Sequence, residues 1–111
     1  MRILGVKLYK PSDMARRLLY KKPVDIPMEF HDDIYNKLSE HKRAFDYFTN
    51  RYGITFSFTE QPKNHTADVY CIKRNIFRGE GKWAKTTISS QEDFADSARS
   101  IYKTIDEILK D

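Results

Sequence analysis

The order of elements in residues 54–111 limits the fold of this chain more than any other feature of the sequence. Three strand-like runs follow one another there and lead into one amphipathic helix. In residues 54–60, apolar side chains alternate with Thr and Ser, which is the period-two pattern of a half-buried strand. The second run spans residues 66–72 and the third spans residues 83–88. Consecutive strands followed by a helix indicate an α+β fold.

The final helix is predicted by a capping sequence and by an apolar stripe. The sequence Ser89-Ser-Gln-Glu92 matches a capping box, in which Ser89 accepts from the first turn and Glu92 reaches back. Asp93 adds negative charge at the end where the helix dipole favours it. The apolar stripe, at spacings of four, three, four and three residues, consists of Phe94, Ala98, Ile101, Ile105 and Ile108. We therefore expect a helix that is capped by Ser89 and packs this stripe on the core.

The first half of the chain supplies one more strand and a long helix. Alternating apolar residues in 4–8 predict a first strand, and residues 12–20 predict a short helix. Two prolines mark residues 21–28 as an extended connector. A long helix is expected from about residue 31 to residue 52, closed by Gly53 in the left-handed conformation. Its apolar stripe consists of Ile34, Leu38, Phe45, Phe48 and Tyr52.

Together these elements predict a single α+β domain over residues 1–111. A four-stranded sheet has two main helices packed on one face, in the order β-α-β-β-β-α, which is similar to a double-stranded-RNA-binding domain. Residues 10–30 form an extra segment between the first strand and the long helix. The sequence Gln61-Pro-Lys-Asn64 is expected to join two strands as a turn, and residues 75–81 to join the next two.

The composition excludes several classes of protein. The single cysteine, Cys71, excludes an internal disulfide and a cysteine-built zinc site, and we expect it to be a small core residue. His31, His41 and His65 are too scattered to predict a metal site, and each is expected at the surface or in a turn. No Ser/His/Asp grouping, phosphate loop or nucleotide fingerprint is present, so neither an enzyme nor a cofactor is expected. The chain has no long apolar run and no signal-peptide pattern, which favours the cytoplasm and not a membrane.

The charges are unevenly distributed along the chain. The net charge is +4, with +4 in residues 1–30, +3 in residues 54–88 and −3 in residues 89–111. Basic patches beside an acidic helix suit an oriented approach to a polyanion. Ordinary solubility charge is the alternative interpretation.

The main candidate for RNA binding is the basic turn between the last two strands. Its glycines would let the backbone approach a phosphate closely, and its arginines could grip one with two hydrogen bonds. Trp83 would either stack on a base or ribose or lie in the core. The candidate residues of this turn are Lys73, Arg74, Arg78, Lys82, Trp83 and Lys85.

Two further groups of residues could contact RNA. Lys63 and His65 lie in the turn between the first two strands of the second half. A secondary basic patch consists of Arg16, Arg17, Lys21, Lys22, Lys42 and Arg43, for which a solvated surface is the alternative.

Two segments carry a resemblance to a known family. The strand His65-Thr-Ala-Asp-Val-Tyr-Cys-Ile-Lys73 and the helix sequence of residues 92–109 are similar to those of the short bacterial ribosome-hibernation-promoting factors. The resemblance covers about residues 31–110 and implies a β-α-β-β-β-α fold. It also implies binding to the small ribosomal subunit over the mRNA and tRNA sites, which silences translation. The last helix ends in acidic residues, where members of that family tend to be basic.

Double-stranded-RNA-binding domains share the α-β-β-β-α core, and residues 62–65 lie where their loop enters the minor groove. Their last helix opens with a lysine cluster, whereas Ser-Ser-Gln-Glu-Asp stands here and would repel phosphate.

The sequence thus leaves two hypotheses about function. The first is a non-catalytic protein that binds ribosomal or other structured RNA and acts by occupying it. The second is a small protein-binding inhibitor or adaptor, for example of phage or mobile-element origin, which would bind through the acidic last helix or a sheet edge.

Overall fold

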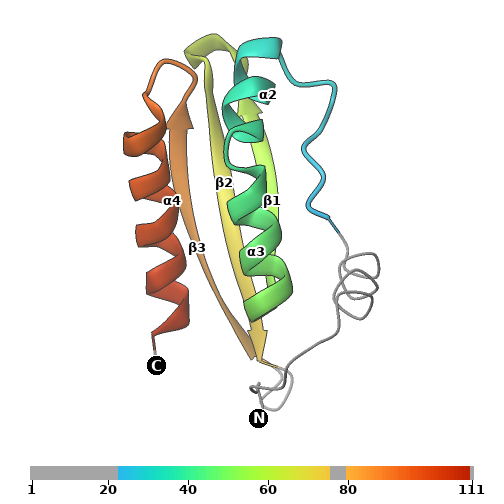
Figure 1. The fold of residues 1–111 in the computed structure, drawn as a ribbon, viewed down its shortest axis with the longest axis vertical. Helices are drawn as coiled ribbons and strands as arrows, with labels where there is room; N and C mark the ends of the chain where they lie inside the picture. The colour runs from blue at the N-terminus through green and yellow to red at the C-terminus, as the bar shows by residue number, and fades with distance from the viewer. Residues whose placement is uncertain (1–22, 76–79, 111) are drawn as a thin grey trace, which may run out of the picture.

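The computed structural model describes residues 23–75 and 80–110, which form three α-helices and a three-stranded sheet (Figure 1). All helices lie on the same face of the sheet, with α3 over β1 and α4 over β3. A 3-10 turn, η1 (Pro62–Asn64), joins β1 to β2. The elements are α2 (Asp32–Ser39), α3 (Lys42–Tyr52), β1 (Ile54–Gln61), β2 (Thr66–Asn75), β3 (Glu80–Ser89) and α4 (Phe94–Leu109).

The sheet is antiparallel throughout and has β2 at its centre. Phe56 of β1 lies opposite Cys71 of β2, which in turn lies opposite Ala84 of β3. Since side chains alternate along a strand, this register places one apolar row under the helices. The three strands predicted within residues 54–88 are therefore confirmed, each slightly longer than the sequence pattern indicated.

The core lies between this face of the sheet and the helices. Phe45 of α3 is fully buried, and its ring contacts those of Phe56 and Phe58 at centroid distances of 4.8 and 5.3 Å. From α4, the predicted stripe is buried at Ile101 and Ile105. Two tilted aromatic contacts of this kind contribute about 0.5–1.5 kcal/mol each beyond the burial of area.

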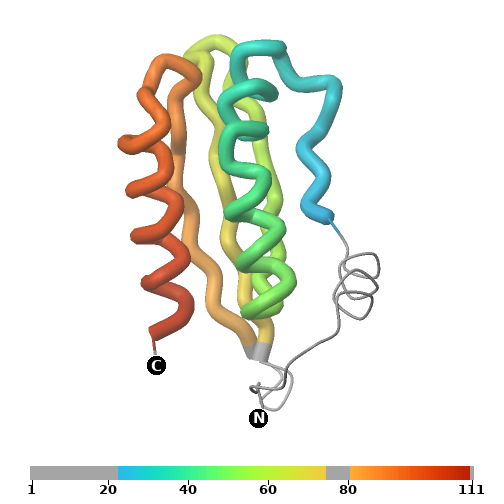
Figure 2. The backbone as a smooth tube through the Cα atoms, viewed as in Figure 1, coloured from blue at the N-terminus to red at the C-terminus, as the bar shows by residue number. Residues whose placement is uncertain are grey.

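The long helix predicted for residues 31–52 is interrupted, and this prediction was wrong in detail. The chain leaves helical geometry at His41, with φ −106° and ψ 9°, so that α2 and α3 are separate helices (Figure 2). The interruption turns the His41 side chain inward, where its ring stacks on Phe94 at 4.7 Å. Burial of His41 between the helices accounts for a break that contains neither Gly nor Pro. His41 therefore lies in a turn, one of the two places expected for it, but not at the surface, because only 2% of it is exposed.

The predicted end of this helical region is confirmed. Gly53 adopts the left-handed conformation with φ 70°, and its N–H donates to the Thr49 carbonyl at 3.0 Å. Glycine reaches this conformation without the steric cost that other residues meet.

The start of the last helix differs from the prediction. Asp93, not Ser89, is the N-cap of α4, and its Oδ1 accepts from the Asp96 N–H at 2.8 Å. Ser89 and Glu92 do interact as a capping box would require, since the Ser89 N–H donates to Glu92 Oε1 at 2.6 Å. They form the turn between β3 and α4 instead. Asp and Ser are comparably good N-cap residues, so the sequence pattern alone did not decide between Ser89 and Asp93.

The connector before α2 packs against the core over its described part. Residues 23–30 have neither helix nor strand, as predicted, and run alongside α3 (Figure 2). Val24 and Ile26 are buried, and the Val24 N–H donates to Asp46 Oδ1 of α3 at 2.7 Å. The predicted first strand in residues 4–8 and the short helix in residues 12–20 lie outside the described residues. Within residues 23–75 and 80–110, no helix is long and apolar enough to cross a membrane.

Candidate nucleic-acid interface

The face of the sheet turned away from the helices is the candidate binding surface. None of the described helices covers it, because α2, α3 and α4 all lie on the other side (Figure 1). Strand alternation and the register place a consistent set of side chains on it. They are Thr55, Ser57 and Thr59 of β1, Asp68, Tyr70, Ile72 and Arg74 of β2, and Trp83, Lys85 and Thr87 of β3.

Trp83 is the most informative residue of this face. It is 66% exposed, so the alternative in which Trp83 belongs to the core is wrong. Its ring lies beside that of Tyr70, with centroids 6.2 Å apart and planes inclined by 36°. Together with Ile72, these rings line a shallow depression of about 330 Å³. We call the surface formed by Tyr70, Ile72, Trp83 and Lys85 the tryptophan face.

The charges around the tryptophan face are positive. Lys85 lies opposite Tyr70 in the register, and its Nζ is 6.0 Å from the centroid of the tyrosine ring, within reach of a cation–π contact. Arg74 is exposed near the other end of the depression. Asp68 is the one carboxylate that the described strands place on this face, and it is only 8% exposed. Its Oδ1 accepts from Thr87 Oγ1 at 2.6 Å, so the carboxylate is engaged within the sheet.

The predicted basic turn is not one cluster, because the pleat divides it between the two faces. Lys73 and Lys82 lie opposite each other on the helix side of the sheet. Lys73 Nζ donates to the Tyr52 carbonyl at 2.9 Å, at the end of α3, and Lys82 Nζ donates to the Lys110 carbonyl just after α4. Both lysines therefore compensate the negative ends of helices. Arg74 and Lys85 remain on the open face, and Arg78 lies outside the described residues.

Gly81 makes a close backbone approach to the neighbouring strand, while its approach to a phosphate stays a prediction. A Cβ on Gly81 would lie 2.9 Å from the Lys73 carbonyl oxygen of the neighbouring strand. The close approach that glycine permits here is to β2. Gly79 lies outside the described residues.

Lys63 and His65 are exposed at the opposite end of the sheet from Arg74. His65 is a turn residue, as predicted, with φ 55°, and its Nδ1 lies 2.8 Å from Asp33 Oδ2 of α2. This hydrogen bond lowers the pKa of Asp33. β2 is ten residues long, so roughly 30 Å separates this turn from the basic end of the sheet. Tyr70, the residue of the tryptophan face nearest to this turn along β2, is five residues from His65, or roughly 17 Å, so Lys63 and His65 are not part of that face.

A second histidine–carboxylate pair lies at the same end. His31 Nδ1 is 2.8 Å from Glu60 Oε2, and the His31 N–H donates to the same oxygen at 2.5 Å. The hydrogen bond to Glu60 raises the pKa of His31. The backbone hydrogen bond from His31 is the main cause that lowers the pKa of Glu60. These contacts fix the start of α2 to the end of β1.

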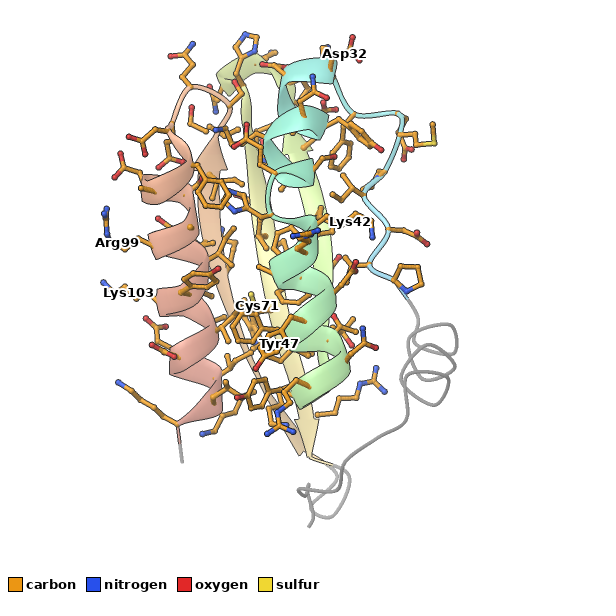
Figure 3. All side chains as sticks on the ribbon, in the orientation of Figure 1. Asp32, Lys42, Tyr47, Cys71, Arg99 and Lys103 are labelled. Atoms are coloured by element: carbon orange, nitrogen blue, oxygen red, sulfur yellow. The ribbon has the colours of Figure 1, made fainter. Side chains whose placement is uncertain are left out.

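The secondary basic patch is described only in part. Lys42 lies on α3 and pairs with Asp46 at 2.9 Å, while Arg43 is exposed (Figure 3). Both belong to the helix side of the molecule. Arg16, Arg17, Lys21 and Lys22 lie outside the described residues.

The described residues hold no group of three or more His, Cys, Asp or Glu side chains that could bind a metal. Cys71 is buried, as predicted, and burial raises the pKa of its thiol to about 12. A thiol with such a pKa is unreactive at neutral pH.

Sequence reasoning missed Tyr70, which completes the aromatic pair. In residues 69–72 apolar or aromatic side chains occupy every position, so the strand pattern did not separate its two faces. Once the register is known, the exposed Trp83 shows which side chains of β2 lie on the open face, and Tyr70 is one of them. In comparisons with protein-family models, with curated proteins and with solved structures, nothing matches this chain.

Proposed function

We propose that this protein is a non-catalytic RNA-binding protein that acts by occupying its target. The observation that carries the proposal is the exposed Trp83 beside Tyr70 and two cations, on a sheet face that the described helices leave open. Tryptophan is highly buried on average, so a tryptophan that is 66% exposed beside a second aromatic ring is informative. Aromatic rings next to basic side chains are the elements with which proteins bind bases and phosphates together.

The proposed target is ribosomal or other structured RNA. The resemblance of residues 31–110 to ribosome-hibernation factors supports the small ribosomal subunit as this target. In the full proposal the predicted strand in residues 4–8 adds a fourth strand to the sheet and gives the order β-α-β-β-β-α. The RNA contacts lie on the tryptophan face and on Arg74.

Sedimentation with ribosomes at low and at high salt tests the proposal. The protein should travel with the ribosomal fraction at low salt and leave it as salt rises, because phosphate contacts release counterions. The double variant Arg74→Glu with Lys85→Glu should remain in the soluble fraction at both salt concentrations. Lys103→Glu is the matched control, since Lys103 is an exposed lysine that points away from the sheet on α4 (Figure 3).

Absence of the wild-type protein from ribosomes at every salt concentration would exclude the ribosomal target. If the double variant sediments like the wild type, the open face is not the contact surface.

A protein-binding inhibitor or adaptor is the second candidate, and one observation favours it. The helix side carries exposed aromatic rings at Tyr47, Tyr52 and Tyr102, grouped around the half-buried Phe48 (Figure 3 shows Tyr47 there). Exposed aromatic side chains are enriched where proteins bind each other. Recovery of one stoichiometric protein without RNA in a pull-down, lost in Tyr102→Ser and retained in Trp83→Ala, would favour this candidate.

A further inference from the structure

We infer that the tryptophan face binds unpaired RNA, with two neighbouring bases stacked on Trp83 and Tyr70, an inference that rests on the proposed function. It names the form of RNA that this surface recognises, which is a single strand or a loop rather than a duplex.

The spacing of the two rings is the first reason. Their centroids are 6.2 Å apart and their planes are inclined by 36°, so the rings lie side by side and each can accept a base. In a duplex, neighbouring bases stay stacked at about 3.4 Å along each strand. Two such bases cannot each reach a separate ring at nearly twice that spacing. Bases of an unpaired segment can be splayed apart and stacked individually.

The shape of the surface is the second reason. The depression lined by Tyr70, Ile72 and Trp83 is shallow and lies on a sheet, and none of the described helices projects from this face into a groove. A duplex offers only base edges in its grooves, and its base planes are hidden within the stack. An aromatic ring on a flat face therefore has no partner in a duplex, whereas unpaired bases present both planes.

The charges along the strands fit the backbone of such a segment. Lys85 is in the cross-strand row of Tyr70, while Arg74 is in the row beyond Trp83. Successive rows on one face are about 7 Å apart, so Lys85 lies level with the Tyr70 end of the aromatic pair and Arg74 lies one row beyond its Trp83 end. Gly81 is the cross-strand neighbour of Arg74 and leaves it without an adjoining β3 side chain. Phosphates flanking two stacked bases would meet one cation at each end.

The opening of α4 argues against the duplex alternative. Asp93 caps this helix and Asp96 lies in its first turn. These carboxylates repel phosphate, whereas double-stranded-RNA-binding domains, whose element order the sequence resembles, open their last helix with a lysine cluster. Because α4 lies on the other face of the sheet, its start is not on the tryptophan face.

The single tryptophan of the chain allows a direct test. Because Trp83 is the only source of tryptophan fluorescence, a base stacked on it should quench that signal. The probes are a 5′-labelled oligouridine of about twelve nucleotides, an RNA duplex of equal length, and the single-stranded DNA equivalent. Single-stranded RNA should bind at low salt and quench the fluorescence of Trp83. The duplex should bind more weakly and quench this fluorescence less.

Variants then separate stacking from charge. Trp83→Ala should lower affinity for the single-stranded RNA roughly 5- to 150-fold by fluorescence polarisation, the loss expected for one stacked base. Tyr70→Ala should have an effect in the same range. Tyr102→Ala, an exposed aromatic residue of α4, should leave affinity unchanged. Circular dichroism confirms that each variant is folded.

The outcomes distinguish this inference from the proposed function. Equal binding of duplex and single strand, with Trp83→Ala unaffected and Lys85→Glu weakened, would overturn stacking and leave RNA binding intact. Tighter binding of the DNA strand would overturn the assignment to RNA. Failure of every RNA to bind at low salt would overturn the proposed function, and this inference with it.

Discussion

His41 of the α2–α3 junction and Ser97 of α4 are joined by a buried hydrogen bond, with 2.7 Å between Nε2 and Oγ. The Ser97 hydroxyl is also 3.1 Å from the Asp93 carbonyl, to which it can donate. Its lone pair then accepts from the Nε2–H of the histidine. This bond joins the α2–α3 junction to α4, beside the stack of His41 on Phe94 and the contact between Phe48 and Tyr102.

Ser97→Ala should destabilise the protein by about 1–3 kcal/mol, because it leaves the buried Nε2 of His41 without a partner. Urea unfolding followed by circular dichroism measures this loss. Ser100→Ala is the matched control on the same helix, since the Ser100 hydroxyl donates only to the Asp96 carbonyl at 3.2 Å and is partly exposed. Equal stability of the two variants would show that the bond to His41 contributes nothing.

His41 should also make the protein less stable in mild acid. Burial lowers the pKa of His41 below its ordinary value of 6.5, and Lys37 acts in the same direction while Glu40 and Glu92 oppose it. As the pH falls through about 6.5, the unfolded chain takes up a proton here that the folded chain does not. The free energy of unfolding therefore falls, by at most about 1.4 kcal/mol per pH unit from this group.

Two variants reveal this contribution in urea unfolding between about pH 7 and pH 5.5. His41→Gln should flatten the loss of stability on acidification. His31→Gln should steepen it, because Glu60 raises the pKa of His31 and its contribution is complete below pH 6.5 and lost as the pH rises through the folded value. Identical pH profiles for the two variants would contradict both assignments.

The sequence predicted the elements well wherever a local pattern had one interpretation. Alternation in residues 54–60 gave β1, and the stripe from Ala98 to Ile108 gave the buried side of α4. Gly53 was predicted as a left-handed cap because no other residue type ends a helix in this way so readily. These are properties of the nearest neighbours in the chain, which the sequence contains in full.

The site was harder to predict because it depends on which side chains of paired strands lie on the same face of the sheet. A cluster of basic residues around one turn looks continuous in sequence, yet the pleat sends Lys73 and Lys82 to the helix side and Lys85 to the other. His41 follows Leu38 by three residues and precedes Phe45 by four, which is the spacing of the apolar stripe. This spacing indicated burial, but a polar histidine is usually expected at the surface. Only the tertiary register separates a helix-capping lysine from one that is available to a ligand.

Replacing Lys73 with alanine should therefore change stability, whereas replacing Lys85 with alanine should change RNA binding. Lys73→Ala removes a cation from the end of α3 and should cost about 0.3–1 kcal/mol of stability with little change in RNA affinity. Lys85→Ala should leave stability unchanged and reduce the slope of log affinity against log salt by about 1. Urea unfolding and polarisation titrations at several salt concentrations check both. A loss of RNA affinity in Lys73→Ala equal to that in Lys85→Ala would show that Lys73 contacts the ligand.

Gly81 and Gly53 should be intolerant of side chains for different reasons. Gly81→Ala places a Cβ against the backbone of β2, 2.9 Å from the Lys73 carbonyl oxygen, and should cost about 1–3 kcal/mol. Gly53→Ala meets nothing within 4 Å, so its cost, about 1–2 kcal/mol, comes from the left-handed conformation alone.

Asparagine separates the two causes, because it tolerates the left-handed conformation better than alanine but has the same Cβ. Gly53→Asn should recover part of the stability lost in Gly53→Ala, whereas Gly81→Asn should be no more stable than Gly81→Ala in urea unfolding. Recovery at Gly81 would mean that backbone conformation, and not the contact with β2, requires glycine there. Because Gly81 is the cross-strand neighbour of Arg74, a side chain at Gly81 that separates β3 from β2 should also weaken RNA binding.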